Sequence, residues 1–532
     1  MNVRPGMWAG FRNLAVLALG LVCAIALMNC GSNNNPYAAM PMGSGTSTGM
    51  ATQEVKATCA PTDNIETGLQ GQTTLAQRMN GDAARGLNCN LKLMGQFQGE
   101  GAYHAQTWVD NCSYYSTADG ATQAHPGVAV IDVTDPTQPV ATAYLNSPSM
   151  LETWESLKMS TARHLLAAVE SEGGEGTAPG FAVYDVSNCS APVLDATIDL
   201  PIPAGTEIKG HAGAMAPDGM TYYGSTYLTG IYIIDISNPS NPTLLLNWIP
   251  PNGIGAPHDL SVSEDGNRLY VMQPQTSSYG VTIPASAQGK NGLVILDVSD
   301  FQSRKANPQV RVVSTLFWKD GGVAMTSEQI AIHGVPYLLV SDELQEGTRA
   351  AACTNGTSVF GYARLINISD ETNPTQTSLL KLQVDDPANC AQLANDPAFV
   401  ASEEGTSFGY SAHYCTADNR TDARLVACSR HEAGIRVFDV STPTAPTEVA
   451  YYKPPIHTGA NLPGSGINGV QDRTYDWNKS HSRFLNRNGV IELWTTSCDN
   501  GFQVLQFESN LTSSKPQLFV NVPTSLTANT VP

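Results

Sequence analysis

The sequence predicts an all-β fold, a seven-bladed β-propeller built from four-stranded antiparallel blades. Three observations lead to this prediction. A block consisting of a β-branched strand and a polar turn recurs seven times along the 532 residues. Further short apolar strands flank every copy, at a period of about 50 to 70 residues, which is typical of a four-stranded repeat unit. Between residues 90 and 510 no apolar pattern of helical period competes with these strands.

The recurring block has one form: a glycine or tyrosine, four mostly apolar residues, and then a polar residue that opens a turn. Where that residue is Asp, we expect its side chain to fix the turn through the backbone, as Asp does after many strands. Val128–Asp132 is a representative strand. The seven copies begin at Gly127, Gly180, Gly230, Gly292, Tyr362, Gly434 and Gly501.

Each copy needs an inner hairpin before it and an outer strand after it. Asp218-Gly219 and Asp265-Gly266 predict tight hairpins between the first two strands of blades three and four. Two segments compete to complete the last blade and close the ring, Leu91–Phe97 and Gln517–Asn521, and the sequence does not decide between them. A short helix is expected around Thr73–Gly86.

These copies resemble the LVIVD-repeat proteins, bacterial β-propellers that are mostly exported. The resemblance covers about residues 90–510 of the chain. It implies the propeller fold but little about function, because a propeller scaffold serves binding and catalysis alike.

The N-terminus predicts export. Arg4 and Arg12 precede an apolar stretch, Leu14–Met28, which suits the core of a signal peptide and is short for a membrane span. The stretch ends at Asn29-Cys30-Gly31-Ser32, which resembles a bacterial lipoprotein signal with Cys30 as the lipidated residue. We therefore expect a signal peptide at 1–30, a polar tether and lead-in at 31–86, and the propeller at 87–532. The mature protein is expected on the cell envelope, at its periplasmic face or the cell surface.

Eleven cysteines favour disulfides in an exported chain. Cys415 and Cys428 flank one hairpin and are expected to pair. Proximity in the sequence further suggests Cys353 with Cys390, and Cys89 with Cys112. Cys189 is then the expected free thiol, because it lies in a short loop that carries no Cys in the other repeats.

The charge balance excludes one class of partner. The chain has 47 acidic and 28 basic residues, a net charge of -19. Nucleic-acid binding needs an excess of Lys and Arg for phosphate contacts, so we expect no nucleic-acid partner. The expected partners are the membrane, through the lipid, and a protein, glycan or small-molecule ligand.

Half of the ten histidines fall at one position of the repeat, about 10 to 12 residues before the second strand of a blade. This position begins the innermost strand, so the side chains are expected to converge at the mouth of the central channel. Long loops are predicted on the same face, and long loops in a compact repeat fold are usually functional. The candidate site residues are His104, Glu155, His211, His258, Glu328, His413 and His481.

The expected function is a binding or interaction module that acts through the long-loop face. The alternative, from a different class, is a metal-dependent enzyme, an oxidoreductase, with copper, iron or zinc held by some of the candidate histidines. A structural role for these residues in the channel is the alternative to both. Three weaker candidates are the recurring Asp residues, the loop Ser171–Gly176 for calcium, and Arg430-His431-Glu432 on the long-loop face.

Overall fold

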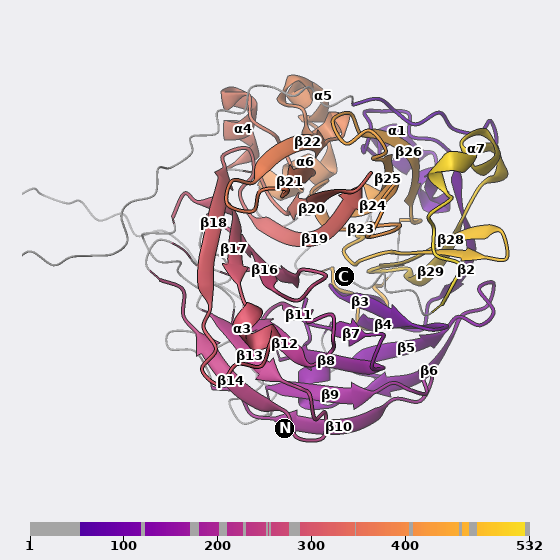
Figure 1. The fold of residues 1–532 in the computed structure, drawn as a ribbon. Coiled ribbons are helices and arrows are strands. Elements are labelled where there is room, and N and C mark those ends of the chain that lie inside the picture. The colour runs from indigo at the N-terminus through magenta and orange to yellow at the C-terminus, as the bar shows by residue number, and fades with distance from the viewer. Residues whose placement is uncertain are drawn as a thin grey trace, which may run out of the picture. The chain divides into compact units, whose positions relative to one another are not determined.

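Seven antiparallel sheets surround a common centre in the computed structural model, which confirms the seven-bladed β-propeller. Figure 1 shows β10, β14 and β18 at the rim and β11, β19 and β23 toward the centre. The structure describes residues 54–118, 123–170, 180–201, 210–226, 230–251, 254, 257–275, 288–345, 347–403, 408–456, 460–467 and 476–526. The predicted signal peptide and the calcium-loop candidate lie outside the described residues.

Blades one to four each contain four consecutive strands. Blade one has β3 (Gln106–Val109), β4 (Cys112–Ser116), β5 (Val128–Asp132) and β6 (Val140–Leu145). Blade two has β7 (Lys158–Ser160), β8 (Leu165–Val169), β9 (Phe181–Asp185) and β10 (Val193–Ile198). Blade three has β11 (Gly213–Met215), β12 (Thr221–Ser225), β13 (Ile231–Asp235) and β14 (Thr243–Trp248). Blade four has β15 (Leu260–Val262), β16 (Arg268–Gln273), β17 (Asn291–Asp297) and β18 (Arg311–Trp318).

Blades five to seven include the ring closure. Blade five has β19 (Ala324–Ile332), β20 (Val335–Asp342), β21 (Ala363–Asn367) and β22 (Thr375–Leu380). Blade six has β23 (Ala412–Ala417), β24 (Leu425–Arg430), β25 (Gly434–Asp439), β26 (Thr447–Lys453) and a fifth strand, β1 (Leu87–Cys89). Blade seven has β27 (Arg483–Arg487), β28 (Val490–Ser497), β29 (Gly501–Phe507) and β2 (Leu91–Phe97). The segment Leu91–Phe97 therefore closes the ring, and its rival lies at the short helix η5 (Pro516–Leu518).

The hydrophobic core lies between the blades. One cluster of buried apolar side chains fills each of the seven interfaces between neighbouring sheets. Between blades seven and one, for example, Trp108 and Ile131 pack with Trp494 and Phe502. Strand residues therefore bury both faces, which explains why the strands read as continuous apolar runs.

The recurring Asp residues fix turns, as predicted. The Oδ1 atom of Asp132 accepts a hydrogen bond from the backbone N–H of Thr134, at 2.8 Å. Asn367 does the same for Ser369 in the weaker fifth copy. The other four bonds of this kind link Asp185 to Ser187, Asp235 to Ser237, Asp297 to Ser299, and Asp439 to Ser441. The Asp-Gly hairpins are also confirmed, with φ values of 64° at Gly219 and 74° at Gly266.

Short helices decorate the strands. The predicted helix near the start is α1 (Leu75–Met79), followed by η1 (Ala83–Arg85). The loops of blades five and six carry a group of helices, seen beside β20 to β22 in Figure 1, and the Cys353–Cys390 disulfide ties two of them together. The remaining helices are α2 (Pro148–Leu151), α3 (Ser299–Gln302), α4 (Arg349–Asn355), η3 (Gln383–Asp385), η4 (Pro387–Asn389), α5 (Cys390–Leu393), α6 (Pro397–Glu403), α7 (Ser509–Ser514) and η5.

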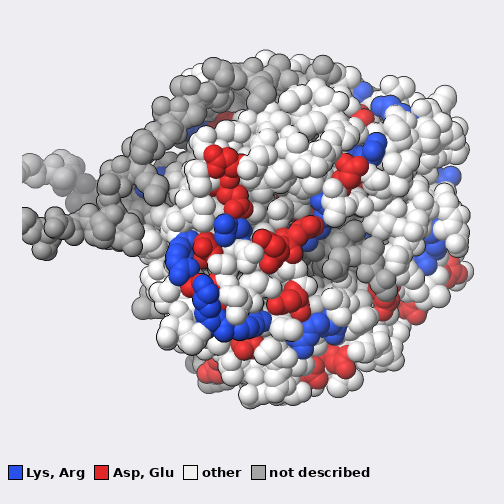
Figure 2. All heavy atoms as spheres, in the orientation of Figure 1, with Lys and Arg blue, Asp and Glu red and all other residues white. Residues whose placement is uncertain are grey.

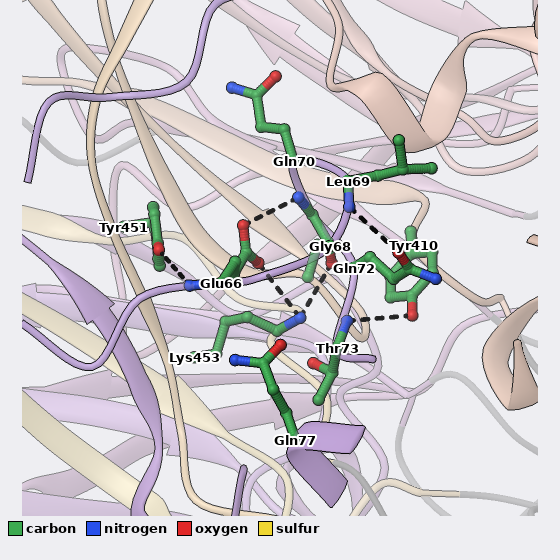
Figure 3. Close-up of polar contacts among 12 residues, drawn as sticks. Glu66, Gly68, Leu69, Gln70, Gln72, Thr73, Gln77, Tyr410, Tyr451 and Lys453 are labelled. Atoms are coloured by element: carbon green, nitrogen blue, oxygen red, sulfur yellow. Dashed lines mark hydrogen bonds and ion pairs between the residues drawn. The ribbon is translucent and has the colours of Figure 1, made fainter. Parts of the chain in front are cut away.

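The described part of the lead-in, residues 54–86, packs on blade six. The backbone N–H of Glu66 donates to Tyr451 Oη at 2.8 Å, and Lys453 Nζ lies 3.4 Å from the Glu66 carboxylate. Figure 3 shows both side chains converging on Glu66. Arg436 also pairs with Glu66 and, at 3.1 Å, with Glu448. All four ionisable groups are buried, so this network fixes the lead-in to the propeller.

The disulfides confirm two predicted pairs and correct the third. Cys415–Cys428 and Cys353–Cys390 form as predicted. The predicted Cys89–Cys112 pair is wrong, because β1 belongs to blade six and β4 to blade one. Cys189 is not free either: its turn lies beside β4, where Tyr114 donates a hydrogen bond to the Cys189 carbonyl. The actual pairs are Cys59–Cys89 and Cys112–Cys189, and the buried Cys498 is the free thiol among the described residues.

Loss of the Cys112–Cys189 disulfide, which joins blades one and two, should lower the stability more than loss of the Cys415–Cys428 disulfide, which lies within one hairpin. Cys112–Cys189 closes a loop with a sequence separation of 77, against 13 for Cys415–Cys428. Because a longer closed loop constrains the unfolded chain more, we expect the double variant C112S/C189S to lose about 4 kcal/mol and C415S/C428S about 3 kcal/mol. Urea denaturation of both variants checks this, and the reverse order would contradict it.

Among helices in the described ranges, none is both long and apolar enough to cross a bilayer. On the face shown in Figure 2, basic and acidic side chains adjoin one another. Ion pairs such as Arg268–Glu371, at 2.7 Å, show this mixing at the level of single residues.

Candidate metal centre

Five of the seven candidate residues meet at one end of the central channel. His104, His211 and His258 lie two residues before the innermost strands β3, β11 and β15, and His413 is the second residue of β23. Glu155 lies in the approach to β7, where its backbone N–H donates to the carbonyl of His211 at 3.1 Å. All five side chains are buried, with exposed fractions of 3% or less. The repeat thus delivers one side chain per blade to the same place.

Glu155 is at the centre of this group. Its Oε1 atom lies 3.3 Å from His413 Nε2 and 3.7 Å from His104 Nδ1. Its Oε2 atom lies 3.1 Å from His211 Nε2 and 4.0 Å from His258 Nε2. One carboxylate therefore faces four imidazoles, two on each oxygen.

Backbone carbonyls hold two of these rings in the orientation that a metal ligand requires. His413 Nδ1 lies 2.6 Å from the carbonyl of Lys479, and His258 Nδ1 lies 3.0 Å from that of Ala324. Because a carbonyl only accepts, Nδ1 carries the proton in both rings and Nε2 is directed at Glu155. Metal-binding histidines almost always donate their other N–H in this way.

Two more donors, which the repeat register did not select, join this group. His431, in the turn after β24, donates from Nδ1 to the carbonyl of Ser411 at 3.1 Å. Glu343 follows β20, and its Oε1 atom lies 3.4 Å from His413 Nε2. His431 belongs to the weaker candidate Arg430-His431-Glu432, and its side chain is buried beside the site. No sequence signal marked Glu343, which follows its strand without a repeated motif.

Burial and mutual charge set the ionisation of the group. Burial would raise the pKa of Glu155, but His211, His413 and His258 hold it well below its ordinary value. Burial lowers the pKa of His104 and His431 well below the usual range, and that of His258 less strongly. Burial also disfavours charged His413, but Glu155 and Glu343 raise its pKa to about 9. Neutral imidazoles beside an ionised carboxylate form a donor set that first-row transition metals prefer, and His413 would have to release its proton to coordinate a cation.

Four polar atoms of the group have close polar neighbours but no hydrogen bond of good geometry to a described residue: His104 Nδ1, His413 Nε2, His431 Nε2 and Glu155 Oε2. Buried polar atoms normally have a partner, and each exception needs a reason. A metal ion coordinated by these atoms would supply the missing partner. The residues present therefore fit a cation at this position.

Aromatic residues and a lysine surround the donors. The Trp154 ring stacks on His104 at 4.6 Å between centroids and lies 5.5 Å from His211. Trp154 has a φ of 47°, a costly conformation for a bulky residue that persists where the surroundings impose it. Lys479 Nζ donates to the Gly466 carbonyl at 2.7 Å and lies 4.9 Å from the Tyr103 ring. Such surroundings exclude water and strengthen electrostatic interactions inside the site.

Glu328 and His481 do not reach Glu155. Glu328 pairs with Leu339 in the middle of β19, and His481 Nδ1 lies 3.1 Å from Thr416, three residues along β23 from His413. Both line a separate cavity of about 40 Å³ in the channel, together with Lys158. Counting back from the second strand of each blade predicts both residues at the channel mouth. β19, however, begins four residues before Glu328, so Glu328 lies within the strand and farther along the channel.

Glu328 should make the protein less stable as the pH rises. Burial raises its pKa to about 7, and Arg420 offsets this only in part. The folded state therefore holds its proton more tightly than the unfolded state, so its contribution is complete below about pH 4.5 and is lost toward pH 7. We expect E328Q, which keeps the acceptor for Ala417 N–H, to be about 1–3 kcal/mol more stable than wild type at pH 8 and equal at pH 4. Urea titrations at both pH values check this, and equal stability at pH 8 would contradict it.

A cation held by these residues would supply Lewis-acid chemistry at an oxygen ligand, and copper or iron would also supply electron transfer. The protein's own part is to fix the imidazoles, keep the site dry and hold a carboxylate beside the reacting position.

The fold and site together define a class, a seven-bladed β-propeller with a histidine-rich centre in its channel. The LVIVD repeat family matches residues 228–248 and 287–308. These segments cover the third and fourth strands of blade three and the third strand of blade four. The protein is an LVIVD-repeat β-propeller. No curated protein matches the chain.

Proposed function

We propose that this protein is a metal-dependent enzyme whose transition-metal centre lies at the mouth of the propeller channel. The observation that carries the proposal is the convergence of four buried imidazoles on one buried carboxylate, with ring orientations set by backbone carbonyls. The donors are His104, Glu155, His211, His258 and His413. A propeller of LVIVD repeats suits binding in general, and in this proposal the ligand of the long-loop face is the substrate.

A feature of the loop face supports a substrate-binding role. The helical group of blades five and six reaches the site through Phe408, whose ring stacks on His431 at 4.5 Å. Arg349 of α4 donates to the Phe408 carbonyl at 3.1 Å. Only the ring of Phe408 would therefore separate a ligand that contacts these helices from His431.

Elemental analysis tests the proposal. The untagged mature chain, purified without chelators, should carry at least one equivalent of copper, iron or zinc. The double variant H211A/H258A should lose bound metal, whereas H481A, which removes a channel histidine outside the group, should retain it. Copper or iron would favour redox chemistry at the site, and zinc would favour Lewis-acid chemistry. Absence of metal from a folded wild-type protein, before and after reconstitution, would reject the proposal.

We also propose that the chain is exported and anchored to the cell envelope by a lipid on Cys30. Four disulfides among the described residues support export, because such bonds persist in oxidising compartments. Mass spectrometry of the mature N-terminus should find a lipid-modified Cys30, and C30S should appear in the soluble fraction. An unmodified N-terminus at another residue would contradict this proposal.

A further inference from the structure

The seven donors of the site exceed what one first-row cation needs. Besides His104, His211, His258, His413 and Glu155, the site contains Glu343 and His431. Their donor atoms form groups of three in which all atoms lie within 4.8 Å of one another. The groups are His104–Glu155–His413, Glu155–His211–His258 and Glu343–His413–His431.

The size of a coordination sphere explains this grouping. Metal–nitrogen bonds of about 2.0–2.1 Å place any two ligands of one cation no more than about 4.2 Å apart. Each group of three matches that size after a small contraction. Glu155 belongs to two groups, and it offers a different oxygen to each: Oε1 to His104 and His413, and Oε2 to His211 and His258.

We propose that the site holds two cations bridged by the Glu155 carboxylate. The proposal rests on the metal centre proposed above and adds its nuclearity. The first cation is bound by Oε1, His104 and His413, and the second by Oε2, His211 and His258. Separations of about 3.5–4 Å are usual in two-metal sites, which clamp one oxygen ligand between both cations.

Glu343 and His431 complete the first position. An imidazole nitrogen coordinates one cation, so His413 cannot serve both groups to which it belongs. Glu343, 3.4 Å from His413 Nε2, therefore adds an anionic donor on the side of the first cation. This second buried carboxylate also offsets charge that two divalent cations would otherwise leave unpaired. His431 Nε2 is buried without a hydrogen bond on the same side.

Metal counting with single-position variants tests the bridge. Chelated and then copper-reconstituted wild type, freed of excess metal by gel filtration, should contain two copper ions per chain. H104A should lose one ion from the first position, and H211A one ion from the second. H481A should keep both. Circular dichroism of each variant confirms folding.

Electron paramagnetic resonance tests the coupling between the ions. Two Cu²⁺ ions that share a carboxylate couple magnetically, so wild type should show far less than two spins per chain. H104A and H211A should each show one full spin, and E155Q should lose the coupling. A single copper ion, lost in H104A and H211A alike, would overturn the two-cation proposal and leave the proposed function standing. Two uncoupled ions would also overturn it, because a shared Glu155 carboxylate requires coupling, whereas no bound metal would reject both proposals.

Discussion

Replacing Arg436 with methionine is expected to lower the free energy of unfolding by about 3–5 kcal/mol, the range for removal of one partner from a buried ion pair. Arg436 has an exposed fraction of 0% and contacts two carboxylates, Glu66 and Glu448. Its pKa is raised because these carboxylates outweigh the effect of burial. Methionine retains much of the volume but leaves both carboxylates without their main partner.

The same variant should release the lead-in from blade six. Glu66 lies on that segment, and Lys453 alone would then remain to pair with it (Figure 3). We expect limited proteolysis to cut R436M between residues 54 and 86 at least tenfold faster than wild type, since a cost of 1.4 kcal/mol changes an opening equilibrium tenfold. R85A is the matched control: its pair with Asp82 is exposed and should contribute less than 1 kcal/mol. Equal effects of R436M and R85A on stability would contradict this account.

Metal binding should stabilise the propeller strongly. The donors come from blades one, two, three, four and six, so metal bound at the site links five of the seven blades. A metal that binds the folded state alone adds about 4 kcal/mol to the free energy of unfolding at a free concentration of 1,000 times its Kd. Denaturation with and without copper or zinc measures this increment.

This increase in the free energy of unfolding should depend on the residues of the proposed metal centre alone. H211A/H258A should lose a large part of it, because both imidazoles on Glu155 Oε2 are removed. H333N is the control, since His333 is an exposed histidine at a hairpin turn with a φ of 51°, which Asn tolerates. An increment that is as large in the double variant as in wild type, or disappears in H333N, would place the bound metal elsewhere.

The sequence was sufficient to predict the fold because the repeat carries its own markers. Residues such as Asp132 and Asp235 open the same turn in blades one to six, so the strand order follows from counting them. Ring closure was undecided, since Leu91–Phe97 and Gln517–Asn521 have similar apolar patterns. Only pairing with β29 separates them, and that pairing joins residues at opposite ends of the chain.

The repeat also predicted part of the site. His211 and His258 stand just before their inner strands, so the register alone brings them together. Glu328 fits the same count along the chain but lies within β19, because that strand begins earlier than its counterparts. Glu343 is brought to His413 by contacts between blades five and six, which no local pattern encodes. The Cys89–Cys112 pair was predicted wrongly because the two residues are close in the sequence but lie in different blades.

Anomalous X-ray diffraction from metal-loaded crystals tests the central claim most directly. Data collected at the absorption edge of the bound metal should show density within about 2.0–2.2 Å of His211 Nε2 and of the Glu155 carboxylate. The two-cation arrangement predicts a second peak on the side of His104 and His413. Crystals of metal-containing protein with no anomalous peak at Glu155 would contradict the claim that this group of residues is a metal centre.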